Sequence, residues 1–282
     1  MNLQNETIER LPAVEGVLNY LTRTADKPRE YAFDAFEPPP GAQRALYEPH
    51  RVPIRDMRRV AGQVSLDREG FSLISHRSEV GDFSDTDRLR HVYYPEAERR
   101  VAAATGASRV VVFDHTIRRR IPGPADRSPG APRQPSTYIH CDYSAKSGPQ
   151  RVRDFMGDEA EALLRRRYAI VNVWRPILGP LRDWPLAICD TQSVSADDWV
   201  ATDLVHRDRL GETYLLTYRP SHRWFYVPEM RVDEALLLKC YDSAEDGRAR
   251  FVPHTSFMDP TAPADVLPRA SIELRTFVFF SA

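Results

Sequence analysis

The sequence predicts a mainly β protein with flanking helices, built on a double-stranded β-helix core of the jelly-roll or cupin type. From residue 168 onward, short β-branched and aromatic runs alternate with turn residues. Together with residues 137–143 they make eight candidate strands, which suits a jelly roll. Two groups of metal-ligating residues lie far apart in the sequence, and closure of such a barrel would bring them together.

Size and charge fit one soluble globular unit. The chain has 282 residues, 42% of them hydrophobic, and a formal net charge of −1. This length is enough to bury a large core. The small net charge produces no overall electrostatic field that would attract nucleic acid or an acidic membrane. We expect a single domain over 1–282, in which 1–90 form an N-terminal arm with flanking elements and 91–282 form the core. The sequence leaves the oligomeric state open, with a homodimer as one alternative.

The first half is expected to contain few strands. A proline run at 38–40 followed by Gly41 blocks regular structure, so residues 1–50 are interpreted as an arm that covers the later domain. Short strands are predicted at 52–57 and 71–76, and residues 82–85 are expected to form a helix N-cap region. A helix is predicted from Tyr94 to Thr105, with Pro95 in its first turn and Gly106 at its stop.

A strand is predicted at 110–113, continuing towards Arg118. The proline- and glycine-rich stretch 121–136 is predicted to be a loop, either a binding loop or a surface excursion. A helix is expected over 153–167, although the low helix propensity of Gly157 weakens this prediction near its start. The remaining predicted strands are 137–143, 168–174, 186–189, 213–218, 223–227, 236–241, 250–254 and 272–280.

The strongest chemical signal is His140-Cys141-Asp142 read together with the distant His254. Side chains alternate along a strand, so His140 and Asp142 share one face and Cys141 points into the core. Two imidazoles and one carboxylate around one side of a metal form the 2-His-1-carboxylate facial triad, which suits non-haem Fe(II). The His-x-Asp pattern alone is weak evidence for a metal site. A half-buried strand histidine hydrogen-bonded to a neighbour would give the same pattern. The other histidines show no second metal spacing, although His115 beside Asp114 is the least secure exclusion.

Arg269 and Ser271 follow His254 on another predicted strand. A fixed guanidinium there can grip a carboxylate with two parallel hydrogen bonds, and the Ser271 hydroxyl can add a third. Arg275 shares the same strand face and competes for this role, although Arg269 is favoured.

Three cysteines without a CxxC pair argue against a disulfide framework and for a reducing compartment. No secretory signal and no apolar run long enough to span a membrane is visible, so a cytoplasmic enzyme is expected.

Several motifs across residues 90 to 280 carry a family resemblance: NVWRP at 172–176, DWPLA at 183–187, HRWFY at 222–226, EALLLKCYDS at 234–243, PHTSF at 253–257 and RASIELR at 269–275. In combination they resemble the gibberellin desaturase-like and aspergillic-acid hydroxylase-like oxygenases, with the cephamycin 7α-methoxylation subunit as a relative. The resemblance implies an enzyme that uses Fe(II), 2-oxoglutarate and O2 to hydroxylate, desaturate or otherwise oxidise a small molecule, often in secondary metabolism. Succinate and CO2 would be the coproducts.

The family pattern maps the metal ligands onto His140, Asp142 and His254, and the cosubstrate anchor onto Arg269 with Ser271. Under this interpretation Tyr138 contacts the cosubstrate or lines the pocket, with a core tyrosine as the alternative. Asn172 and Trp174 share a strand face and would touch cosubstrate and substrate respectively. For these two the alternatives are a satisfied strand amide and a large core residue.

Two other functions remain open on the sequence. One is a cupin-like metal enzyme that works without 2-oxoglutarate, and the other is a non-catalytic partner subunit of a biosynthetic complex.

Overall fold

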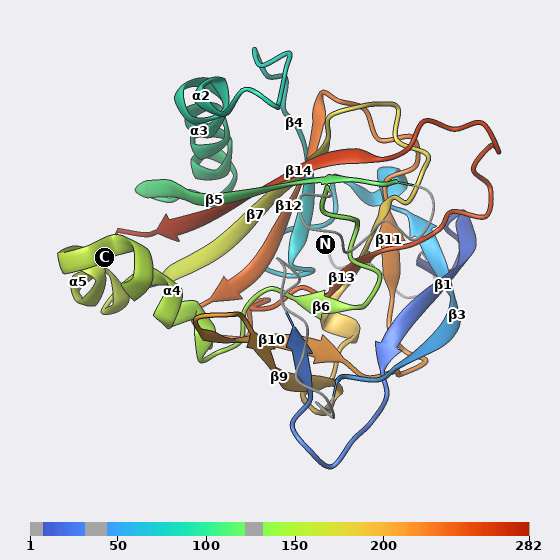
Figure 1. Cartoon of the computed structure of the whole chain (residues 1–282), viewed down its shortest axis with the longest axis horizontal. Coiled ribbons are helices and arrows are strands. Elements are labelled where there is room, and N and C mark those ends of the chain that lie inside the picture. Colours follow the sequence, from blue (N-terminus) through green and yellow to red (C-terminus); the bar gives the residue numbers. More distant parts are fainter. Residues whose placement is uncertain (1–7, 32–43, 122–131, 282) are drawn as a thin grey trace.

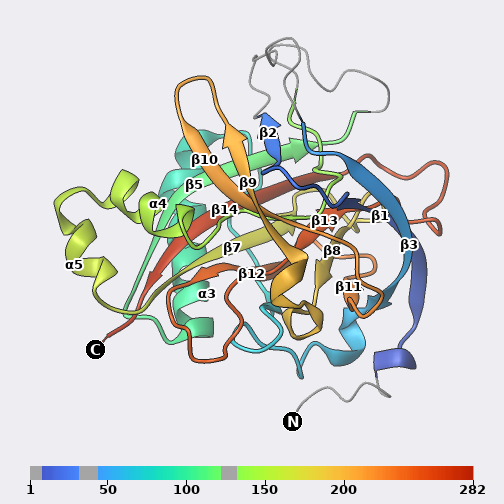
Figure 2. The ribbon, with the colours of Figure 1, turned by 90° about the horizontal axis from the view of Figure 1, so that it is seen from below.

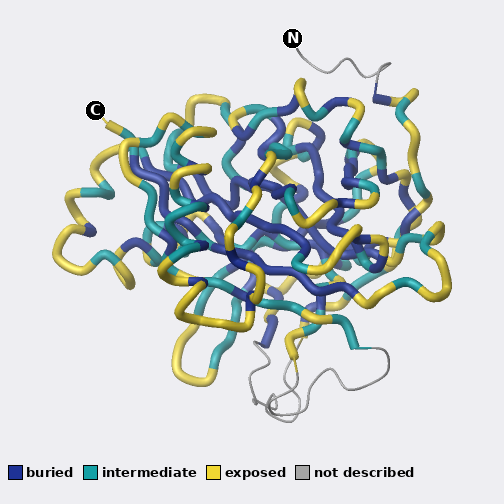
Figure 3. The backbone as a smooth tube through the Cα atoms, turned by 90° about the horizontal axis from the view of Figure 1, so that it is seen from above, coloured by how far each residue is buried: buried dark blue, intermediate teal, exposed yellow. Residues whose placement is uncertain are grey.

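A computed structural model describes residues 8–31, 44–121 and 132–281. Two curved sheets make up most of the molecule, which confirms the predicted mainly β class (Figure 1). Buried backbone concentrates in the strands at the centre, while the exposed residues lie mainly in connecting loops and helices (Figure 3).

The five-stranded sheet contains the two fully buried strands at the centre of the fold. Its order is β4 (Phe71–Ser75), β12 (Glu234–Asp242), β7 (Tyr168–Pro176), β14 (Ala270–Phe279) and β5 (Arg109–Arg119). Every residue of β7 and β12 is buried, because both faces of these strands are covered. Val171, Val173 and Leu274 point outward and pack in one cluster with Tyr93 and Val101. The residues between them point into the barrel.

The nine-stranded sheet curls around the inner face of the first sheet, and its β9–β10 hairpin projects from the body (Figure 2). Bridges from Asn19 to Tyr138 and from Leu21 to Thr217 link its first strand to distant parts of the chain. In order its strands are β1 (Ala13–Leu21), β3 (Tyr47–Asp56), β11 (Trp224–Tyr226), β8 (Leu186–Cys189), β13 (His254–Ser256), β6 (His140–Cys141), β10 (Leu210–Leu216), β9 (Trp199–Val205) and β2 (Arg29–Tyr31).

The helices lie outside the two sheets. Helix α3 packs against β5, β14 and β7, so it covers the outer face of the five-stranded sheet (Figure 1). Gly106 ends it at φ 70°, a left-handed conformation that glycine adopts without steric cost. The α-helices are α2 (Thr86–Arg88), α3 (Tyr94–Thr105), α4 (Ser147–Met156) and α5 (Ala160–Leu164), and a π-helical turn spans Leu89–Tyr93.

Several predicted elements differ from the structure in extent. The helix expected over 153–167 begins earlier and breaks at Gly157, whose φ is 52°. The strand expected over 137–143 is reduced to His140–Cys141, and the one expected over 250–254 starts at His254. Within the predicted N-terminal arm, 13–21 and 29–31 are strands of the nine-stranded sheet. The proline run at 38–40 and much of the predicted loop 121–136 lie outside the described residues.

Candidate metal centre and cosubstrate pocket

His140 and His254 face each other across two neighbouring strands. Strands β6 and β13 pair antiparallel with His254 directly opposite His140, so the two side chains leave the sheet on the same face. Their ring centroids are 4.6 Å apart. The long sequence gap between the two histidines is therefore closed by one strand pairing.

Both imidazoles are oriented by backbone carbonyls. Nδ1 of His140 lies 3.0 Å from the carbonyl oxygen of Tyr138, and Nδ1 of His254 lies 3.1 Å from that of Val252. A carbonyl oxygen only accepts, so each Nδ1 carries the proton and donates it. This arrangement leaves both Nε2 atoms as lone-pair donors for a metal, with the tautomer fixed by the partner of the other nitrogen.

Asp142 completes the cluster. Its Oδ1 lies 3.5 Å from Nε2 of His140, and one potential ligand atom from each of Asp142, His140 and His254 lies within 4.8 Å of the others. The other carboxylate oxygen, Oδ2, accepts hydrogen bonds from Nδ2 of Asn172 at 2.8 Å and from Nε of Arg275 at 3.0 Å. One oxygen is therefore held by the protein while Oδ1 points at the imidazoles.

The charge states of these groups suit a divalent cation. Burial lowers the pKa of His140 to about 3, and the neighbouring His254 adds to this effect. Burial alone would raise the pKa of Asp142, but Arg275 and the two imidazoles hold it well below its ordinary value. At neutral pH His140 is thus neutral and Asp142 is ionised, the forms that bind metal. Two nitrogens and one oxygen on one side of a common point fit the facial triad of non-haem Fe(II).

Arg269 is buried, at 3% exposure. Two of its guanidinium nitrogens have hydrogen-bond partners in the protein. Its Nε donates to Oγ of Ser271 at 3.1 Å and its Nη1 donates to the carbonyl oxygen of Trp184 at 2.8 Å. Its Cζ lies 4.9 Å from the centroid of the Trp174 ring, within cation–π range. Burial lowers the pKa of Arg269 to about 9, and Arg118 adds to the shift.

Arg275, on the inner face of β14, is bound differently from Arg269, which directly precedes that strand. Its three nitrogens all face carboxylates: Nε bonds Asp142, Nη1 lies 3.1 Å from Asp114, and Nη2 lies 3.3 Å from Glu273. Of the two arginines that the sequence offered as anchors, Arg275 is thus engaged with carboxylates of the protein.

The remaining predicted site residues lie beside this cluster. The Tyr138 ring stacks on Tyr47 at 5.2 Å and lies 5.2 Å from the His140 ring. The amide of Asn172 donates both to Asp142 and, at 2.9 Å, to Oε1 of Glu273, whereas its buried Oδ1 has no partner among the described residues.

Sequence reasoning missed Arg118 and Glu273. In the register of the five-stranded sheet, Arg118 lies opposite Ser271 and Glu273 opposite Trp174, so both share the inner face. Strand parity could have placed Glu273 beside Arg269 and Arg275. Nothing in the sequence gives the pairing of β5 with β14, which brings in Arg118. His115, the least secure exclusion, shares a 2.6 Å hydrogen bond with Tyr94.

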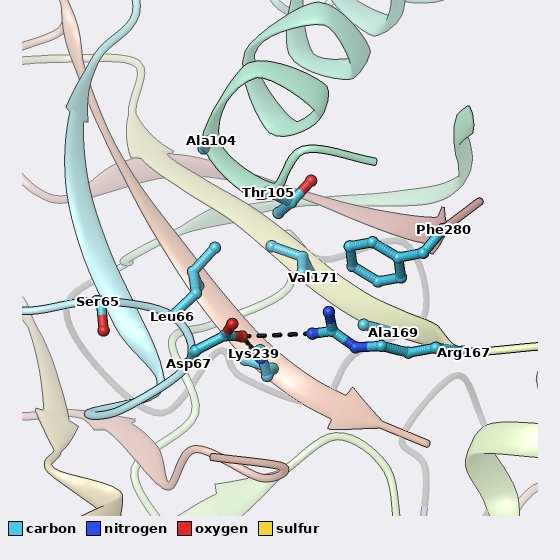
Figure 4. Close-up of a pocket in the computed structure, with 10 residues that line it drawn as sticks. All are labelled: Ser65, Leu66, Asp67, Ala104, Thr105, Arg167, Ala169, Val171, Lys239 and Phe280. Atoms are coloured by element: carbon cyan, nitrogen blue, oxygen red, sulfur yellow. Dashed lines mark hydrogen bonds and ion pairs between the residues drawn. The ribbon is translucent and has the colours of Figure 1, made fainter. Parts of the chain in front are cut away.

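A separate cavity of about 130 Å³ lies on the opposite side of the five-stranded sheet (Figure 4). Ala169 and Val171 line it, and they alternate along β7 with the inward-facing Asn172 and Trp174. Its two cations have protein counter-ions, because Arg167 and Lys239 each pair with both Asp67 and Asp242. The metal-ligating cluster is not part of this cavity.

Among the described residues, no helix has the length and apolar character needed to cross a membrane.

Comparison with known proteins agrees with the fold. The family model of the oxidoreductase/YMDC permease-like domain matches residues 18–279. The hydroxylase/desaturase efuI of Hormonema carpetanum is 31% identical, with 95% of this chain and 96% of that relative covered. The Fe(II)/2-oxoglutarate-dependent dioxygenase nvfI of Aspergillus novofumigatus is 28% identical, over 89% of this chain and 91% of the relative. A solved structure of the iron and alpha-ketoglutarate-dependent endoperoxidase NvfI aligns with a TM-score of 0.83 at 25% identity, covering 96% and 98% of the two chains.

The fold and the His-Asp-His cluster thus define an Fe(II)- and 2-oxoglutarate-dependent oxygenase with a jelly-roll core, as the sequence predicted. The chain belongs to this oxidoreductase family, whose relatives include fungal enzymes named hydroxylase/desaturase. Fe(II), 2-oxoglutarate and O2 are the cofactors and cosubstrates of this class.

Proposed function

We propose that Nε2 of His140, Oδ1 of Asp142 and Nε2 of His254 hold the Fe(II) ion. The convergence of these three ligand atoms within 4.8 Å is the observation that carries the proposal. The hydrogen bonds to Nδ1 of each imidazole and to Oδ2 of Asp142 support it, because they direct the remaining lone pairs towards one point. Three protein ligands on one side leave room for a cosubstrate and dioxygen.

For 2-oxoglutarate, we propose that Arg269 and Ser271 bind the distal carboxylate. The guanidinium of Arg269 is buried, shares a hydrogen bond with Ser271, and has no carboxylate of the described residues within salt-bridge distance. Arg275 and Asn172, which the sequence offered as cosubstrate contacts, instead act as positioning residues that orient Asp142. Tyr138 lines the pocket beside His140.

The substrate would be a small natural product, oxidised at a carbon atom within the barrel. Relatives named hydroxylase/desaturase and endoperoxidase support this class of reaction. When bound, Fe(II) with 2-oxoglutarate and O2 supplies the oxidising power, with succinate and CO2 as coproducts. The chain itself fixes the ligands, holds the cosubstrate and limits access of water, and Trp174 is proposed as a pocket wall on the substrate side.

We further propose that the whole chain acts as one oxygenase domain in the cytoplasm. All three cysteines are buried and unpaired, which supports a reducing compartment.

Anaerobic titration tests the proposal. Metal-free protein is mixed with Fe(II) and then with 2-oxoglutarate, while the visible metal-to-ligand charge-transfer absorption is recorded. We expect the band to develop with 2-oxoglutarate in the wild type and to be absent in His254→Ala, a variant that loses one ligand. A metal-dependent activity that proceeds without 2-oxoglutarate, or a protein that binds no Fe(II), would contradict the proposal. Succinate release with candidate substrates then identifies the reaction.

A further inference from the structure

Arg118 is a charged residue of the inner sheet face that the proposed roles leave unused. It lies on β5 directly opposite Ser271 of β14, so the two side chains leave the sheet on the same face. Arg269, two residues before Ser271, is its diagonal neighbour. Arg118 therefore lies beside the two residues proposed to bind the distal carboxylate of 2-oxoglutarate.

The guanidinium of Arg118 has little compensation from the protein. Among the described residues it makes one hydrogen bond, from Nη1 to the carbonyl oxygen of Gln134 at 2.7 Å, and no carboxylate lies within salt-bridge distance of it. The nearest inner-face acid along β14, Glu273, is already bound: Oε1 accepts from Asn172 and Oε2 lies 3.3 Å from Arg275. Arg118 is half-buried, and a cation withdrawn from water normally has a counter-ion, because burial without one is costly.

Electrostatics place Arg118 near both the proposed anchor and the metal ligands. It contributes to the lowered pKa of Arg269 and to that of His140. Burial lowers its own pKa and Arg275 adds to this effect, while Glu273 and Asp142 partly offset it. Two guanidinium groups that repel each other in a buried site favour an anion between them.

We propose that Arg118 is a second binding residue for 2-oxoglutarate, which donates hydrogen bonds to one of its carboxylates alongside Arg269. The proposal rests on the proposed function, because it assumes that 2-oxoglutarate occupies the space between Ser271 and the metal ligands. A dianion there would be matched by two guanidinium groups and by the metal ion. Arg118 would then act on binding of the cosubstrate and not on assembly of the metal ligands.

The test compares dissociation constants of 2-oxoglutarate from the charge-transfer band under anaerobic conditions. Arg118→Gln is expected to weaken binding by about 10- to 100-fold, the effect of losing a hydrogen bond between charged groups. Arg119→Gln is the matched control, because Arg119 is the exposed next residue of the same strand and faces the other side. Fe(II) affinity is measured in parallel and is expected to stay within about threefold of the wild type in both variants.

A second ligand, 2-oxopentanoate, identifies the carboxylate involved, because it has the same chain length but lacks the distal carboxylate. If Arg118→Gln weakens only 2-oxoglutarate, Arg118 binds the distal group. If it weakens both ligands, Arg118 binds the carboxylate next to the metal. Either result supports the proposal.

An unchanged dissociation constant for 2-oxoglutarate in Arg118→Gln, with a normal band in the wild type, would overturn this inference and leave the proposed function intact. A wild type without the band would instead refute the proposed function. If Arg118→Gln does not fold, Arg118→Lys decides the question. It keeps the charge but loses the planar fork, so a weakening of threefold or more supports the proposal and an unchanged value overturns it.

Discussion

Replacing Arg275 by glutamine tests whether this guanidinium stabilises the folded protein by compensating the carboxylates on the inner sheet face. The Arg275 guanidinium faces Asp142, Asp114 and Glu273 at distances of 3.0, 3.1 and 3.3 Å. Asp142 and Glu273 are mostly buried, and without Arg275 the Asn172 amide is left as the donor that they share. The substitution therefore leaves two negative charges in a poorly solvated site, close to one another.

Breaking a buried ion pair by removing one partner costs about 3–5 kcal/mol. At roughly 2.1 cal/mol/K per residue, the unfolding entropy of a 282-residue chain is about 0.6 kcal/mol/K. The metal-free Arg275→Gln variant should therefore melt about 5–8 °C below the wild type. Saturating Mn(II) or Co(II) should reduce this difference, because a bound dication next to Asp142 replaces part of the lost positive charge.

Scanning calorimetry of metal-free and metal-saturated protein measures both effects. Arg119→Gln serves as the control for loss of an arginine from a solvent-facing site, and it should melt within about 2 °C of the wild type. The reasoning would be refuted if metal-free Arg275→Gln melted within about 2 °C of the wild type. It would also be refuted if saturating metal left the difference unchanged.

Three further predictions concern single sites. Arg269→Lys should weaken 2-oxoglutarate binding by about 10- to 100-fold without changing Fe(II) affinity, since lysine lacks the planar fork; equal affinities in the charge-transfer titration would contradict the anchor role. Burial lowers the pKa of His76 to about 4. Between about pH 6.5 and 4 the unfolded chain therefore binds a proton at this residue that the folded protein does not, and the free energy of unfolding falls as the pH decreases. His76→Phe should reduce that slope by up to about 1.4 kcal/mol per pH unit in urea unfolding, and an unchanged slope would exclude this residue as its source. Gly148→Ala would bring a methyl group to 2.6 and 2.7 Å from ring atoms of Tyr241 and should cost about 1–3 kcal/mol, whereas Gly62→Ala, with nothing within 4 Å, should be near neutral in the same assay.

The convergence of the candidate ligands could be predicted from the sequence because it depends on strand parity and on residue type. His140, Asp142 and His254 are brought together as the spacing indicated, although β6 is much shorter than predicted. The His140 and Asp142 side chains still converge, although Asp142 lies at a bend just after the strand. Arg269 and Ser271 share a face and a hydrogen bond, as expected for residues two apart on one strand.

Pairing between distant strands could not be predicted. The register that sets Arg118 opposite Ser271 joins segments from opposite halves of the chain, and no local pattern specifies it. For the same reason the sequence could not decide between Arg269 and Arg275. That choice depends on where Asp114 and Glu273 lie, and the first of these comes from β5. The strands β1 and β9 were missed because their polar and glycine positions break the alternation that marks a half-buried strand.

The distribution of positive charge without protein counter-ions on the inner face favours one position for the proposed cosubstrate. The Arg275 guanidinium faces three protein carboxylates, so the cation of β14 beside Asp142 is fully paired within the protein. The guanidinium groups of Arg269 and Arg118 bond only neutral oxygens of the described residues, namely two backbone carbonyls and the Ser271 hydroxyl. Positive charge without a protein counter-ion therefore accumulates around Ser271, at the end of the strand away from Arg275. A dianionic cosubstrate that chelates the metal at one end and reaches Ser271 at the other is the species that this arrangement would stabilise.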